Sequence, residues 1–316
     1  TPLCIAVEHA DAKSAEALLH AGANADATRE DGMAAIHLAA QNGDGSIDVL
    51  RMLLQGRGGG DGADHSLQNA DEDTALHICV RQQFSACIEL LLEEGAEART
   101  IVNSKQQAPL HLAAENSDPE AAQMLLDYGA DPNAQDDEMD TPLHISVRNK
   151  DAETTTKLLT AEATTQREVC NPSPTNAAGD TPLHIITPYD DPDGTNELLE
   201  FGADVCAINE AGLTPLLIAC KKKLKGIIAI YIDAGADPNV ADAKDNTALH
   251  IVAMDKDKGN VEKMLQMGAD TELKNRGGDT SLLLAIKGGD QTNINLVLEA
   301  HCNVMEPNNK GKTAIA

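Results

Sequence analysis

The sequence predicts an all-α repeat solenoid built from stacked helix-turn-helix units, and two observations carry that prediction. A four-residue motif returns at steps of 33, 40, 34, 33, 40, 33, 33, 33 and 33 residues. An apolar pair followed by a Gly-Ala-Asp-like turn marks the second half of the unit. Self-similarity at a fixed period of about 20–50 residues is the signature of stacked-repeat proteins. The motif starts at Thr1, Ala34, Thr74, Ala108, Thr141, Thr181, Thr214, Thr247, Thr280 and Thr313.

Each unit predicts two helices. In the fifth, Thr141 suits the N-cap and Pro142 the first helical position. Leu143 and Val147 lie four apart and share one helix face. The second helix carries an apolar pair and ends at a glycine placed for a left-handed cap. Such glycines are Gly129, Gly202, Gly235 and Gly268.

A polar turn joins each unit to the next, as in the stretch 275–279 (Asn-Arg-Gly-Gly-Asp). One helix pair cannot bury its apolar face alone, so neighbouring units must stack. We therefore expect a single array over 1–316. Its repeats 1 to 9 are 1–33, 34–73, 74–107, 108–140, 141–180, 181–213, 214–246, 247–279 and 280–312, with a partial repeat at 313–316.

Repeats 2 and 5 are longer by seven residues. The additions fall at 43–46 and 56–61 in repeat 2 and around 164–174 in repeat 5. We expect exposed loops between intact helices, because loop insertions cost little stability. The insertions are either tolerated without a function or form loops that contact a specific partner.

The period of 33 and the Thr-Pro-Leu-His start, as at Thr181 to His184, resemble the ankyrin repeat over the whole chain. The resemblance implies β-turn or hairpin fingers between the helix pairs. It also implies that partners bind a concave face made of the finger tips and the polar ends of the first helices. The motif histidine is structural in that family. It stands here as His37, His77, His111, His144, His184 and His250.

Composition excludes several classes of function. The net charge of −27 repels nucleic acid and acidic lipid, and the absence of tryptophan removes stacking platforms for single strands. No apolar run approaches the ~18 residues that span a membrane. The seven cysteines form no Cys-x-x-Cys pair, which favours reduced, mostly buried thiols and a cytoplasmic location. Neither end resembles a polar capping repeat, so we expect a segment of a longer polypeptide.

Chemistry-bearing motifs are weak. The motif histidines are spread one per repeat, whereas a metal needs ligands that converge. Acidic runs such as 136–138 lack the ligand spacing of a calcium loop. The glycine-rich run 56–62 lacks the Gly-Lys-Ser/Thr of a phosphate loop. We therefore expect no metal, no cofactor and no enzymatic activity.

The first-helix ends and finger tips supply the candidate binding residues. Four lysines crowd residues 221–225, with an aromatic residue one repeat earlier and a methionine one repeat later. Such a cluster favours an acidic or phosphorylated protein segment, although solvated lysines are the simpler interpretation. Pro188 must shorten or bend its helix unless it lies past the end. The candidates are Arg81, Arg148, Tyr189, Lys221, Lys222, Lys244, Met254 and Lys287.

Two functions remain open. The first is a non-enzymatic scaffold that binds a protein partner along the concave face. The alternative is a cytosolic regulatory or structural segment of an ion channel, a repeat-containing enzyme or a cytoskeletal assembly.

Overall fold

The computed structural model describes residues 1–56, 62–161, 169–255 and 257–315. Of the predicted additions, residues 57–61 in repeat 2 and 164–168 in repeat 5 lie outside the described residues. The chain divides into two compact units, Thr1–Asn171 and Pro172–Ala316, called here the N-terminal and C-terminal units. The single array over 1–316 stays a prediction.

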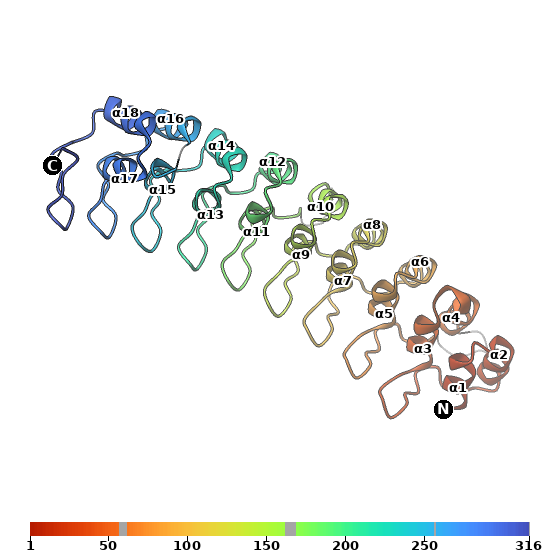
Figure 1. Ribbon diagram of the computed structural model, residues 1–316. Helices are drawn as coiled ribbons and strands as arrows, with labels where there is room; N and C mark the ends of the chain where they lie inside the picture. The colour runs from red at the N-terminus through yellow and green to blue at the C-terminus, as the bar shows by residue number, and fades with distance from the viewer. Residues whose placement is uncertain (57–61, 162–168, 256, 316) are drawn as a thin grey trace. The chain divides into compact units, whose positions relative to one another are not determined.

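The N-terminal unit holds five helix pairs (Figure 1). Its first helices pack side by side in one layer and its second helices in another. The first helices are α1 (Pro2–Glu8), α3 (Ala35–Asn42), α5 (Ala75–Gln82), α7 (Pro109–Glu115) and α9 (Pro142–Asn149); the second are α2 (Ala12–His20), α4 (Ile47–Leu54), α6 (Ser85–Glu93), α8 (Pro119–Asp127) and α10 (Ala152–Leu159), with a 3-10 turn η1 (Gly43–Ser46) before α4.

The C-terminal unit repeats the same two layers over four pairs. Its first helices are α11 (Pro182–Ile186), α13 (Pro215–Lys222), α15 (Ala248–Ala253) and α17 (Ser281–Gly288); its second are α12 (Pro192–Glu200), α14 (Lys225–Asp233), α16 (Lys258–Gln266) and α18 (Gln291–Glu299). Both units confirm the all-α repeat architecture. Over the described ranges the β structure amounts to one isolated bridge, between Ala241 and Thr247.

Capping follows the motif closely. Threonine stands at the N-cap of seven first helices. At Thr214, for example, the hydroxyl accepts a hydrogen bond from the amide of Leu217 at 3.2 Å. Most second helices begin at an aspartate that acts in the same way. Asp118, for example, accepts from the amide of Ala121 at 2.9 Å. The N-cap aspartates were not part of the sequence prediction.

Pro188 has the expected effect. Helix α11 is only five residues long and gives way to the 3-10 turn η2 (Thr187–Tyr189). The buried hydroxyl of Thr187 bonds to the carbonyl of Leu183 and to the phenol of Tyr231. Tyr231 is fully buried in α14, so it belongs to the core. The phenol thus stabilises the shortened helix of the preceding repeat.

Fingers project from the helix layers as long loops (Figure 1). In each, an Asn or Asp side chain folds the tip on itself. The Oδ1 of Asn103 accepts from the amides of Lys105 and Gln107 at 3.0 and 3.1 Å. Tip residues with positive φ complete the turn, as at Gln106 (φ 58°) and Gly212 (φ 70°). The fingers are therefore ordered structures that present side chains at fixed positions.

Candidate partner-binding surface

Five of the motif histidines link their first helix to the next finger. The Nδ1 of His37 accepts from the amide of Ala34 at 3.1 Å, and its Nε2 donates to the carbonyl of Leu67 at 2.9 Å. The equivalent hydrogen bond from Nε2 to a backbone carbonyl is 3.1 Å long for His77, 3.2 Å for His111, 2.9 Å for His184 and 3.1 Å for His250. The amide of Thr141 donates to the Nδ1 of His144 at 3.0 Å.

All six rings are buried, and burial favours the neutral form of five of them. Burial lowers the pKa of His77 from 6.5 to about 4, and it lowers those of His37, His111, His184 and His250 as well. A ring whose two nitrogens already serve the backbone has no lone pair left for a metal. Within the described ranges, no three His, Cys, Asp or Glu residues gather into a metal-binding group.

In the N-terminal unit the two candidate arginines are paired. Arg81 donates through both terminal nitrogens to Asp73, with Nη2 2.9 Å from Oδ1. Arg148 lies 2.6 Å from Asp140. The carboxylates are 3% and 2% exposed, whereas the arginines are 42% and 43% exposed. A buried carboxylate needs its cation, so each arginine stabilises a finger while it faces solvent.

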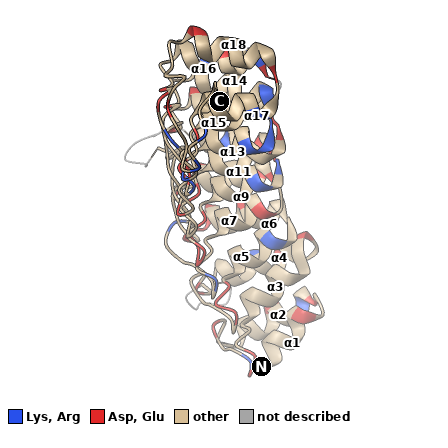
Figure 2. Ribbon diagram, turned by 60° about the vertical axis from the view of Figure 1, so that its left-hand side comes forward, with Lys and Arg blue, Asp and Glu red and all other residues tan. Residues whose placement is uncertain are grey.

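The C-terminal unit holds the other six candidates: Tyr189, Lys221, Lys222, Lys244, Met254 and Lys287. We call these six the helix-end surface. Lys221 lies 2.9 Å from Asp242, and Lys287 lies 2.5 Å from Asp279. The exposed side chains of Lys222 and Lys244 make no ion pair with any described residue. Figure 2 shows both signs of charge along the fingers and the helices.

Successive first helices bring these residues into a row. Helix α13 packs against η2 and α15, and α15 packs against α17. Met254 follows α15 and is 47% exposed. A β-carbon on Gly288 would lie 2.5 Å from the carbonyl oxygen of Met254, so the end of α17 is in close contact with it. Tyr189 is half-buried at the end of η2.

Family models for ankyrin repeats match the chain along most of its length. A three-copy model matches residues 45–136, 110–209, 143–242, 183–275 and 216–308, and a second model matches 3–54. The chain belongs to the ankyrin-repeat family. Membership of this family supports a role as a protein-interaction domain.

A solved structure supports the fold of the ankyrin array. It is the crystal structure of the ankyrin repeat domain of Bcl-3, described as a unique member of the IkappaB protein family. It aligns with a TM-score of 0.62 and 28% identity, over 72% of this chain and 99% of that one.

Curated relatives match a smaller part of the array. The mouse B-cell lymphoma 3 protein homolog is 35% identical over 43% of this chain, and the chicken nuclear factor NF-kappa-B p105 subunit is 34% identical over 42%. Mouse inversin is 32% identical over 44%. The aligned stretches cover 30%, 13% and 12% of those proteins. No helix over the described ranges of the array is long and apolar enough to cross a membrane.

The acidic partners of Arg81, Arg148 and Lys287 were not predicted from the sequence. Asp73, Asp140 and Asp279 each precede the motif threonine directly and stand eight residues before their cation. That spacing recurs in repeats 3, 5 and 9 of the array, so the signal was present in the sequence. It identifies Arg81, Arg148 and Lys287 as finger-stabilising residues as well as candidates for partner contact.

Proposed function

We propose that this chain is a protein-interaction module whose C-terminal unit binds an acidic or phosphorylated protein segment along the helix-end surface. One observation carries the proposal: Lys222 and Lys244 are exposed, and neither forms an ion pair with a described residue. The neighbouring Lys221 is held by Asp242. Unpaired cations beside a fixed framework suit carboxylate or phosphate groups on a partner.

The two lysines belong to one locality. The carboxylate of Asp242 accepts from Lys221 at one oxygen and from the backbone amide of Lys244 at the other, at 2.8 Å. It therefore ties the finger tip that carries Lys244 to the end of α13, which carries Lys222. The site is built before any partner arrives, which lowers the entropy cost of binding.

The charge balance of the two units favours the C-terminal one. Residues 1–171 carry 30 acidic and 11 basic side chains, a net −19, whereas residues 172–316 carry 21 and 13, a net −8. An acidic segment meets less long-range repulsion over the second unit. Met254, half-exposed in the same row, offers an adaptable apolar contact beside the cations.

The test is a charge reversal that leaves Lys221 in place, because Lys221 supports the buried Asp242. Partners are captured from cell extract with the full chain, and the affinity of each is then measured with Lys222→Glu/Lys244→Glu. We expect about a tenfold loss, the sum of two modest surface contacts. The loss should shrink at high salt.

The matched control is Lys13→Glu/Lys157→Glu, which makes the same charge change on α2 and α10. It should bind like the wild type. Equal affinity of the reversal and the control for every captured partner would rule out the helix-end surface.

A second candidate rests on the relatives. The matched stretch is a minor part of each of them, 12% in inversin. The array would then be a regulatory or structural segment of a larger assembly, such as an ion channel, a repeat-containing enzyme or a cytoskeletal complex. This candidate is favoured if the wild type and the Lys222→Glu/Lys244→Glu variant capture the same set of proteins in equal amounts.

A further inference from the structure

An asparagine ladder joins neighbouring repeats of the N-terminal unit. The ninth residue of a repeat reaches back and donates to carbonyls at the end of the preceding first helix. Asn42 donates to Val7 at 2.7 Å, Asn116 to Val80 at 2.8 Å and Asn149 to Ala114 at 3.1 Å. Each amide supplies a donor to carbonyl groups that a helix end leaves without a helical partner.

Repeat 8 is one of the repeats whose ninth residue is not an asparagine. Its ninth residue is Asp255, whose ionised carboxylate has no proton to donate. The carboxylate turns instead to the ammonium of Lys223 at 2.7 Å. Within the described part of the chain, no side chain donates to the carbonyl of Cys220 or Lys221, the positions that the ladder serves elsewhere.

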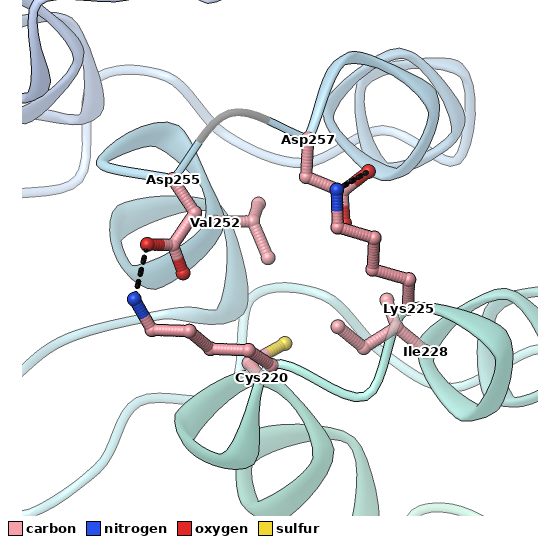
Figure 3. A pocket seen from close by; sticks show the side chains of 7 residues that line it. Cys220, Lys225, Ile228, Val252, Asp255 and Asp257 are labelled. Carbon is pink, nitrogen blue, oxygen red and sulfur yellow. Dashed lines mark hydrogen bonds and ion pairs between the residues drawn. The ribbon is translucent and has the colours of Figure 1, made fainter.

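A cavity of about 200 Å³ lies beside Asp255, between repeats 7 and 8 of the C-terminal unit. Cys220, Ile228 and Val252 line its apolar part (Figure 3). Two ion pairs border it, Lys223 with Asp255 and Lys225 with Asp257, the second at 4.0 Å. Burial raises the pKa of the Cys220 thiol, which therefore stays neutral and acts as an apolar wall.

The border is asymmetric in charge. Lys223 and Lys225 are 67% and 62% exposed, whereas Asp255 and Asp257 are 26% and 11% exposed. The cations are thus outermost, and the unpaired Lys222 is adjacent in sequence. An approaching chain meets positive charge first and an apolar space behind it.

We propose that this cavity receives one apolar side chain, of about the size of leucine, from an acidic partner segment. The inference rests on the proposed function and gives that segment a sequence character: carboxylates on either side of one apolar anchor. The volume suffices, since an apolar cavity of ~150 Å³ holds a benzene molecule. Anchors of this kind supply much of the affinity at protein interfaces.

The probes are two pentapeptides, one with leucine between two pairs of glutamates and one with alanine in its place. They are titrated against the full chain while the methyl resonances of Ile228 and Val252 are followed. We expect the leucine peptide to bind about tenfold more tightly, as burial of the larger side chain predicts, and to shift both residues. A leucine peptide flanked by lysines should not bind.

Two variants close the cavity by different routes. Val252→Met fills the space from α15, and Cys220→Met fills it from α13. Each should abolish the advantage of leucine over alanine while both acidic peptides keep their weaker, charge-dependent binding. A thermal melt of each variant confirms that the array is folded.

The outcomes separate the pocket from the helix-end surface. Equal binding of leucine and alanine peptides, weakened by Lys222→Glu/Lys244→Glu, overturns the pocket and leaves the proposed surface. A leucine advantage that survives in both cavity variants also overturns the pocket. Equal binding of acidic and basic leucine peptides overturns the acidic character of the segment, and no binding of any peptide overturns both proposals.

Discussion

The two units are built from the same repeat, yet they tie their repeats together differently. In the N-terminal unit the ladder amide comes from the end of the first helix, at Asn42, Asn116 and Asn149. In the C-terminal unit, asparagines of the second helices link neighbouring repeats. Asn260 donates to the carbonyl of Lys225 at 3.1 Å, and Asn293 donates to Ala253 and Asp255.

The ends of the first helices in the C-terminal unit carry other side chains. The ninth positions there are Tyr189, Lys222, Asp255 and Gly288. None of the four is an asparagine, so the ladder amide is absent from this position in the C-terminal unit.

The two units should differ most in how much stability they lose at low pH. Four motif histidines lie in the N-terminal unit and two in the other. His77 has a folded pKa of about 4 and an unfolded one near 6.5. Between those values the unfolded state binds more protons, so stability falls as pH drops from 6.5 towards 4. The loss from His77 is on the order of 3 kcal/mol.

The measurement compares urea unfolding of wild type and His77→Gln at pH 7 and at pH 4.5. Glutamine keeps a donor but does not titrate in this range. The stability gap between the two proteins should narrow in acid, and the comparison removes the general effect of reduced net charge. A gap that stays constant would mean that His77 is protonated in the folded array.

Loss of a ladder residue in the N-terminal unit should cost more than loss of Asp255 in repeat 8. Asn116→Ala removes the side-chain donor that reaches the carbonyls of Val80 and Arg81, so we expect a loss of about 2 kcal/mol. Asp255→Ala removes only a solvent-facing ion pair, worth about 0.5 kcal/mol. Urea unfolding of both variants makes the comparison, and equal losses would show that the ladder does not stabilise the interface.

The sequence predicted the repeat and the helix pairs, because capping residues, apolar spacing and glycine act locally and recur in phase. The pairing of Arg81 with Asp73 was not predicted, although the two residues flank the first helix at a separation of eight that recurs at Asp140 and Arg148. The cavity beside Cys220 was equally hidden. It is lined by residues of two neighbouring repeats, so it exists only when repeats 7 and 8 are stacked.

The smallest expected difference is in how much the candidate cations contribute to stability. Arg81 pairs with Asp73 through two bonds and Lys221 with Asp242 through one, while Lys222 has no partner among the described residues. Both paired cations are more than a third exposed, so solvent screening reduces what each pair contributes. We expect Arg81→Met to cost about 1 kcal/mol, Lys221→Met rather less, and Lys222→Met nothing measurable. Urea unfolding at low and high salt would resolve this order. A cost for Lys222→Met as large as that for Lys221→Met would assign Lys222 to the fold, and the surface would lose one of its two unpaired cations.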